Sequence, residues 1–201
     1  MADDVLDWSV AVRALAGETE SGDDAVVTAL PDGALVAAVD GLGHGPEAAR
    51  ATARATELLQ LYANEPLVSL VERCHEALKA TRGVSMSVAR FSVRDDTMTW
   101  VGVGNVEGRL VRRNNRQRSD EALVSLGGAA GFRVQPLRAR TVGLQRGDAL
   151  VFATDGIESS FADSLDAIDT AEQTASEILR RHAKPTDDAL VVVARYLGAS
   201  S

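Results

Sequence analysis

Acidic side chains beside glycine recur in four short segments of this chain, in a setting that suits the binding of divalent cations. The segments are Ser21-Gly22-Asp23-Asp24, Asp40-Gly41-Leu42-Gly43-His44-Gly45, Thr154-Asp155-Gly156 and Thr186-Asp187-Asp188-Ala189. Carboxylate oxygens are preferred ligands of hard cations, and glycine lets the backbone approach a ligand closely. Acids that converge on one point repel one another unless a cation lies between them. The pattern therefore indicates an oxygen-lined cation site, provided that the fold brings the segments together.

Strands are expected to carry three of these segments, because an apolar, β-prone run adjoins each: Ala34–Val39, Ala149–Ala153 and Ala189–Val193. Pro31-Asp32-Gly33 is a turn-former between two such runs. It predicts an antiparallel hairpin of Ala25–Leu30 with Ala34–Val39. An acid at the end of a strand is held by the sheet, so these runs are the elements that would position the site.

Three helices are predicted from periodicity and end signals. Pro46 suits the first position of a helix, which we expect to run to about Ala63. A second helix should begin near Pro66, where apolar residues recur on one face: Leu67, Leu70, Val71, Cys74 and Leu78. The third is expected over Thr170–Ala183, because Thr170 and Gln173 have the spacing of a capping pair.

The remaining elements are expected to be strands. Trp8 to Ala14 alternates and opens the chain, and Leu190–Tyr196 closes it. Between Val84 and Ala153 several strands are separated by turns expected at Asp95-Asp96, Glu107-Gly108 and Arg146-Gly147-Asp148. Strands cluster and helices cluster rather than alternate, which favours an α+β fold with largely antiparallel sheets. The segment from Arg112 to Glu121 has the weakest pattern.

Composition bounds the class of protein. A chain of 201 residues is long enough for one well-buried core, so a single domain over residues 1–201 is expected. A formal net charge of −8 argues against sequence-independent nucleic-acid binding. The lone Cys74 fits a reducing compartment, and no apolar run approaches the ~20 residues of a membrane span. These features predict a cytoplasmic domain that binds neither nucleic acid nor membrane.

Taken in order, the acidic segments resemble the motifs of the metal-dependent PPM (type 2C) protein phosphatases, in their bacterial SpoIIE-like branch. The similarity to the small stressosome phosphatases of that branch covers almost the whole chain. The matching stretches are Gly22-Asp23, Val39–Gly45, Arg146–Ile157 and Asp187–Val192. Four motifs in the family's order are far more specific than a single Asp-Gly pair, which alone is usually a turn.

The resemblance implies an αββα four-layer sandwich, in which two antiparallel sheets face each other with helices outside. It also implies two Mn²⁺ or Mg²⁺ ions at one edge of the sandwich, bridged by Asp40 and a water. Carried over by motif, the metal ligands would be the carboxylates of Asp23, Asp40, Asp155 and Asp187 and the backbone carbonyl of Gly41. Asp40 and Asp155 are the residues on which catalysis would depend.

The implied activity is hydrolysis of phosphoserine or phosphothreonine in a protein substrate, with STAS-domain regulators of a bacterial stress-signalling module as the expected substrates. Two cations would neutralise the phosphate ester and lower the pKa of a bound water. Oxygen ligands select Mg²⁺ or Mn²⁺, and one Cys with three His leaves little material for zinc. The alternatives are a catalytically silent module of the same fold that binds a phosphoprotein, and a small-molecule phosphohydrolase.

Several residues are open at this stage. Adjacent strand residues point to opposite faces, so Asp23 is favoured over Asp24 and Asp187 over Asp188, although Asp188 could bond a metal-bound water. His44 lies two residues beyond the position where many family members carry a histidine. It is either a general acid or a loop contact.

Three further features of the sequence bear on the site. The arginine-rich segment Arg109–Arg118 either docks an acidic or phosphorylated partner or forms a solvated hairpin loop. Asp148 lies in an expected turn and is interpreted as structural. The family's third-metal position often carries an aspartate, and here Asn105 takes that place.

Overall fold

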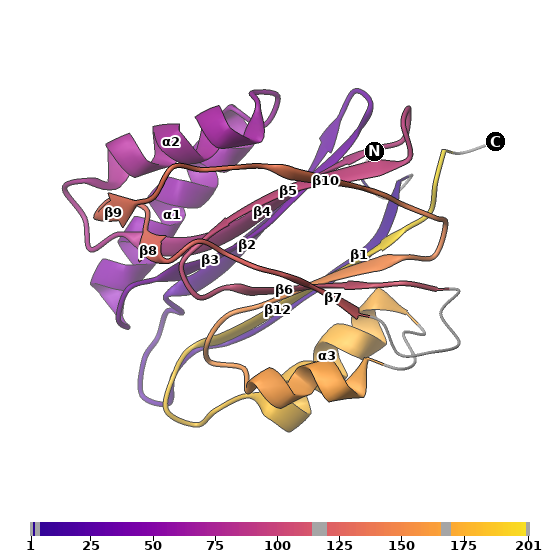
Figure 1. The fold of residues 1–201 in the computed structure, drawn as a ribbon. Coiled ribbons are helices and arrows are strands. Elements are labelled where there is room, and N and C mark those ends of the chain that lie inside the picture. Colours follow the sequence, from indigo (N-terminus) through magenta and orange to yellow (C-terminus); the bar gives the residue numbers. More distant parts are fainter. Residues whose placement is uncertain (1, 3–4, 114–119, 166–169, 200–201) are drawn as a thin grey trace.

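Two five-stranded antiparallel sheets face each other in the computed structural model, which describes residues 2, 5–113, 120–165 and 170–199 (Figure 1). The first sheet has the order β1 (Leu6–Arg13), β12 (Ala189–Tyr196), β11 (Ala149–Ala153), β6 (Glu107–Val111), β7 (Asp120–Leu123). The second has the order β10 (Arg140–Gly143), β5 (Thr97–Val103), β4 (Val84–Ser92), β3 (Gly33–Gly41), β2 (Asp23–Leu30). A small hairpin of β8 (Gly128–Ala129) and β9 (Arg133–Val134) lies beside the second sheet.

Helices cover the outer face of each sheet (Figure 1). Helices α1 (Pro46–Leu61) and α2 (Leu67–Leu78) pack on the second sheet. Helix α3 (Ala171–His182) and the short 3-10 helix η2 (Ser159–Ser164) pack on the first. Three apolar layers result, one under each group of helices and one between the sheets. This is the four-layer αββα arrangement that the family resemblance implies, and it agrees with the α+β fold predicted from the clustering of strands and helices.

Strand β3 is buried along its whole length, because helices cover one of its faces and the opposite sheet covers the other. Such a strand reads as a continuous apolar run, as β3 does up to Asp40. Strand β11 is buried throughout as well. Both strands deliver an acid at the point where they end, so two of the candidate ligands follow rigid elements of the core.

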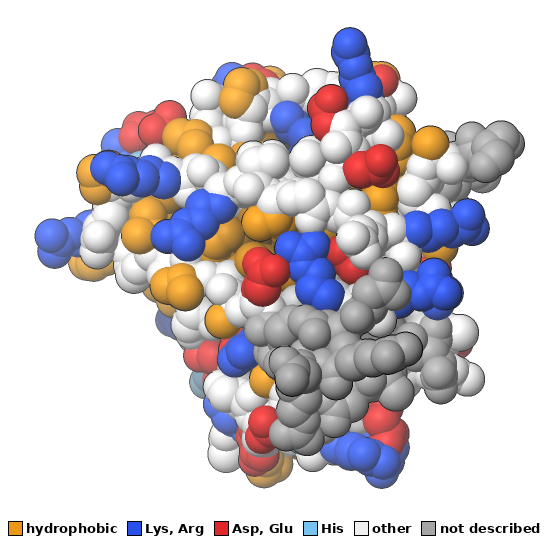
Figure 2. All heavy atoms as spheres, turned by 45° about the vertical axis from the view of Figure 1, so that its right-hand side comes forward, with side chains coloured by type: hydrophobic (Ala, Val, Ile, Leu, Met, Phe, Trp, Pro, Cys, Tyr) orange, Lys and Arg blue, Asp and Glu red, His pale blue; other side chains and the backbone are white. Residues whose placement is uncertain are grey.

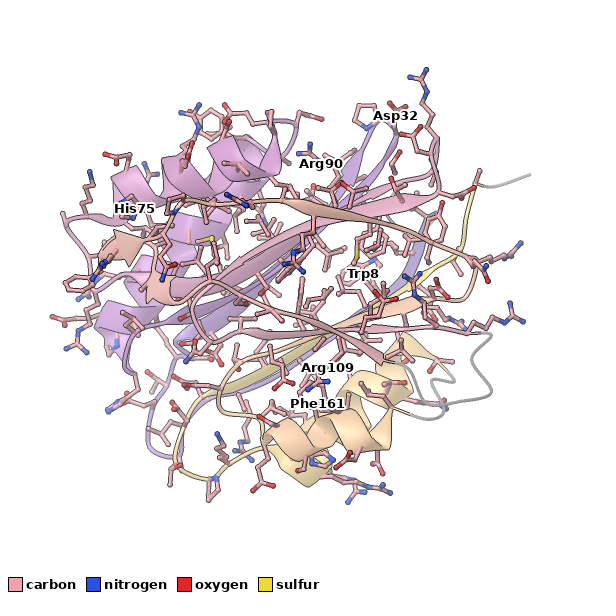
Figure 3. The ribbon with its side chains drawn as sticks, in the orientation of Figure 1. Trp8, Asp32, His75, Arg90, Arg109 and Phe161 are labelled. Carbon is pink, nitrogen blue, oxygen red and sulfur yellow. The ribbon has the colours of Figure 1, made fainter. Side chains whose placement is uncertain are left out.

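The predicted helices and most predicted strands are confirmed. The hairpin of β2 and β3 has the expected turn, α1 begins at Pro46, and the Thr170 side chain accepts a hydrogen bond from the Gln173 amide at 3.2 Å. On β4, Arg90 donates to the carbonyls of Ala63 and Glu65, which anchors the α1–α2 connection (Figure 3).

The turn predicted at Glu107-Gly108 is wrong, because both residues lie inside β6. The chain bends instead around Gly104, whose φ is +89°. Gly108 is needed for packing. A Cβ at this position would lie 3.0 Å from the Cβ of Leu123 and 3.1 Å from Cε1 of Phe152.

The weakly patterned segment from Arg112 to Glu121 includes residues 114–119, which lie outside the described residues. Its two ends are joined by an ion pair of 2.9 Å between Arg112 and Glu121. Within the described ranges, no helix is both long and apolar enough to cross a membrane.

Candidate metal centre

Asp23 and Asp40 lie directly opposite each other, because β2 begins and β3 ends at the same edge of the second sheet. Both are almost fully buried, with 7% and 8% of their surface exposed. The Thr154 hydroxyl, at the end of β11, donates a hydrogen bond of 2.7 Å to Oδ2 of Asp23. A side chain of the first sheet therefore fixes a carboxylate of the second, and the candidate site lies at the seam between the sheets.

The electrostatics of this pair favour a bound cation. Burial raises the pKa of Asp23 to about 7, and the charges of Asp188, Asp155 and Asp187 raise it too, against the lowering effect of the Thr154 hydrogen bond. Burial also raises the pKa of Asp40 to about 8, helped by the charge of Asp23. Both carboxylates are therefore hard to ionise together at neutral pH unless a positive charge lies between them.

Asp155 follows β11 and is held by two groups of the chain. The side-chain amide of Asn105 donates to its Oδ2 at 2.7 Å, and Nζ of Lys184 donates to its backbone carbonyl at 2.5 Å. Burial and the charge of Asp187 raise the pKa of Asp155, while Lys184 and Asn105 act in the opposite direction. Asp155 and Asp187 thus lie within electrostatic reach of each other and of the buried pair.

Asp188 is a support of the site. Its Oδ1 accepts from the Leu15 amide at 2.8 Å and its Oδ2 from the Gly22 amide at 2.9 Å. With its oxygens in these bonds and 3% of its surface exposed, it holds the turn that leads into Asp23. Asp24 is exposed, and its Oδ1 accepts from the amide of Ala25.

Two glycines let the loops of the site approach each other. A Cβ on Gly156 would lie 1.7 Å from the Asp188 carbonyl oxygen, so the loops after β11 and before β12 touch through their backbones. A Cβ on Gly41 would lie 2.7 Å from both the Ala48 carbonyl and the Thr52 hydroxyl. Both positions require glycine for reasons of space.

The donor set fits a hard divalent cation. Within the described ranges, no group of three or more His, Cys, Asp or Glu side chains already stands in a metal-binding arrangement. The carboxylates that face one another here supply oxygen alone, which suits Mg²⁺ or Mn²⁺. A buried, mutually repelling pair of acids is the setting that such a cation stabilises.

The histidines contact other parts of the chain. Nδ1 of His44 lies 2.9 Å from Oε1 of Glu18, and its side chain is 60% exposed, so the loop-contact interpretation is the one that its geometry supports. His75 lies on α2 beside the β8–β9 hairpin and accepts from the Gly131 amide at 3.0 Å (Figure 3).

The described arginines of the Arg109–Arg118 segment pair within the fold. Arg109 bonds Glu107, and Arg112 bonds Glu121 and the buried Asp148. These contacts favour the structural interpretation of both Asp148 and the described part of the segment. Arg116 and Arg118 lie outside the described residues. On the face shown in Figure 2, basic side chains are scattered among acidic and uncharged ones.

Sequence reasoning missed Thr154 as a contributor to the site. Its hydroxyl donates to Asp23 and accepts from the Leu190 amide at 2.9 Å, which joins three segments at one atom. The sequence around Thr154 carries no signal of this contact, because the hydrogen bond joins residues 131 positions apart. Thr52 was missed too; its hydroxyl donates to the Gly22 carbonyl at 2.6 Å.

Comparison with known proteins agrees with this geometry. The Stage II sporulation protein E (SpoIIE) family matches residues 31–197. The phosphoserine phosphatase RsbX of Bacillus subtilis (strain 168) is 29% identical over 141 residues, which are 70% of this chain and 69% of RsbX. A structure from work on the bacterial stressosome has a TM-score of 0.86 at 28% identity, over 94% of this chain and 99% of that one. RsbX in complex with magnesium has a TM-score of 0.86 at 22% identity, over 96% of each chain.

The fold and the match along the chain define the class of protein, that of the metal-dependent serine/threonine protein phosphatases. Within that class, this chain belongs to the SpoIIE family.

Proposed function

We propose that this chain hydrolyses phosphoserine or phosphothreonine in a protein substrate with two Mn²⁺ or Mg²⁺ ions. The ligands would be the carboxylates of Asp23, Asp40, Asp155 and Asp187 and the backbone carbonyl of Gly41. The observation that supports this most is the buried Asp23–Asp40 pair, whose members lie opposite each other on neighbouring strands. Burial raises the pKa of both, and the charge of Asp23 raises that of Asp40 further. Asp40 is the ligand that the two ions would share.

When bound, such ions neutralise the charge of a phosphate ester and lower the pKa of a coordinated water. The residues of the chain prepare the site for them. Thr154 orients the Asp23 carboxylate, Asn105 orients the Asp155 carboxylate, and Lys184 holds the backbone carbonyl of Asp155. Asp188 fixes the turn before Asp23 through two backbone amides. These bonds set the directions of the carboxylates before any ion arrives, which limits the ordering that binding requires.

The proposed substrates are phosphorylated STAS-domain regulators of a bacterial stress-signalling module, and the proposed place of action is the cytoplasm. Two comparisons support this assignment. The relative RsbX is a phosphoserine phosphatase, and one structural neighbour comes from work on the bacterial stressosome. The net charge of −8 agrees with a protein rather than a nucleic acid as the partner.

Phosphate release from a phosphoserine protein tests the proposal. Metal-stripped protein should be inactive and should regain activity on titration with Mn²⁺. Asp40→Asn should reduce turnover at least about 100-fold, because the loss of a shared ligand disrupts the metal site. Asp24→Asn, an exposed neighbour in the same segment, is the matched control and should remain active.

Full activity in excess chelator would contradict the proposal. Calorimetry of Mn²⁺ and phosphoprotein binding, run in parallel, separates the alternatives. Binding without turnover on any phosphoprotein would identify a silent module. Rapid turnover of p-nitrophenyl phosphate with none of phosphopeptides would identify a small-molecule phosphohydrolase.

A further inference from the structure

A cavity of about 290 Å³ lies between the first turns of α1 and the loop that joins α2 to β4. Its lining is mostly polar and charged: Glu47, Arg50, Ala51, Ala80, Thr81 and Arg82. None of these residues belongs to the proposed metal site. The cavity therefore needs an explanation of its own.

Arg82 connects this cavity to the loop that follows β3, the strand that carries Asp40. Its Nη1 lies 2.7 Å from the position that a Cβ on Gly43 would occupy. The amide of Leu42 donates to the carbonyl of Gly83 at 3.1 Å, so the two loops are joined through their backbones. A substrate whose phosphate reached Asp40 would therefore pass close to the Arg82 guanidinium.

The turn that carries Arg82 is fixed from within. The Thr81 hydroxyl donates to the Leu78 carbonyl at 2.7 Å and accepts from the Gly83 amide at 3.0 Å. Both of these bonds are local, so Thr81 shapes the turn. The guanidinium groups are the donors that remain for a ligand, and their planar forks suit carboxylates.

The charge balance of the cavity is positive, although the chain as a whole carries −8. Two guanidinium groups, of Arg50 and Arg82, face one carboxylate, that of Glu47. Nε of Arg82 pairs with Oε2 of Glu47 at 2.6 Å, and Arg50 has no ion pair within the described ranges. On an acidic protein, such a place lowers the repulsion that an acidic substrate would otherwise meet.

We propose that this cavity is a substrate subsite, in which Arg50 and Arg82 bind an acidic side chain close in sequence to the phosphorylated residue. The phosphorylated residue itself would enter the metal centre, so this part rests on the proposed function. Glu47 competes with the incoming carboxylate for Arg82 and thereby tunes the preference for acidic substrates. The subsite selects among phosphoproteins and takes no part in the chemical step.

Matched peptides test the subsite. Phosphoserine peptides in which one Glu is moved through the flanking positions are compared with the same peptides carrying Gln. The wild-type protein should prefer the Glu peptide at one or more positions by about tenfold in kcat/KM, through KM, and added salt should reduce the preference.

Three variants should differ in how they change the preference for Glu peptides over Gln peptides. The double variant Arg50→Gln/Arg82→Gln should abolish the preference for Glu over Gln, and Glu47→Gln should increase it. Arg54→Gln is the matched control. Arg54 lies one turn further along α1, pairs with Glu57 at 2.5 Å and does not line the cavity, so the preference should be unchanged. Circular dichroism confirms that each variant is folded.

Equal kcat/KM for Glu and Gln peptides in the wild-type protein would overturn the subsite, as would a preference that survives in the double variant. Fluorescence anisotropy with labelled forms of the same peptides keeps the two proposals separate. Failure of turnover on every phosphopeptide, with preferential binding of the Glu peptide retained, would reject the proposed activity and keep the subsite. Turnover of phosphopeptides without any preference for Glu would keep the proposed activity and reject the subsite.

Discussion

At the scale of single residues, Thr154 illustrates how one hydroxyl serves the candidate site. It donates to Asp23 and thereby lowers a pKa that burial raises. We expect Thr154→Val to weaken Mn²⁺ binding about tenfold, because an unsupported Asp23 holds its proton more firmly and the Leu190 amide loses an acceptor. Isothermal titration calorimetry measures the change. Thr154→Ser keeps the hydroxyl and should restore most of the affinity, whereas equal affinity in the Val variant would show that the bond does not matter.

The buried acids also predict how stability depends on pH. Burial raises the pKa of Asp23 to about 7 and that of Asp40 to about 8, above the ordinary value of 3.8 that applies to the unfolded chain. The protonated forms are therefore favoured by folding. Without metal, the contribution to the free energy of unfolding is fully present below pH 4 and is lost as the pH rises through 7 and 8.

In thermal melts run in chelator, the melting temperature should accordingly decrease as the pH is raised from 5.5 to 8.5. Mn²⁺ should reduce or reverse this fall, because the cation stabilises the ionised carboxylates. Asp23→Asn/Asp40→Asn removes both titrating groups and should flatten the pH dependence in chelator. A slope that is the same in the wild-type protein and in this variant would contradict the assignment to these two acids.

At the scale of elements, the site depends on two loops that cross closely. Gly156→Ala places a Cβ where the Asp188 carbonyl oxygen lies only 1.7 Å away, so the loops after β11 and before β12 must separate. We expect a loss of a few kcal/mol in the free energy of unfolding and near-complete loss of metal binding. Chemical denaturation and calorimetry measure the two effects. Gly143→Ala, in β10, has no atom within 4 Å of the added Cβ and should behave like the wild-type protein.

The sequence was most informative about the secondary-structure elements. Strands β3 and β11 were predictable because both are buried on two sides and read as continuous apolar runs. Gly108 misled the prediction, because a glycine needed for close packing looks the same in sequence as a glycine needed for a turn. The acids at the strand ends could be identified as candidate metal ligands from their motifs.

The supporting bonds could not be predicted. Thr154 and Asp23 are 131 residues apart in sequence, and Asn105 and Asp155 are 50 apart. Which side chains meet across such separations depends on how the sheets are stacked and on the register of each strand. Periodicity in a single sequence carries information about neither.

At the scale of the whole molecule, the candidate centre lies on the boundary between the two sheets. Asp23 and Asp40 come from the second sheet, while Thr154, Asp155 and Asp187 come from strand ends of the first. The layer between the sheets, where the rings of Phe91 and Tyr196 stack with centroids 6.2 Å apart, sets how the two halves face each other.

This shared boundary has a mechanical consequence. A displacement of one layer along the other by a single residue, roughly 3.3 Å, would carry Thr154 out of reach of Asp23 and pull the two sets of ligands out of alignment. The packing of apolar side chains far from any ion therefore sets how well the ligands of the two sheets are aligned. Divalent ions bound by residues of both sheets would in turn crosslink the two halves of the sandwich.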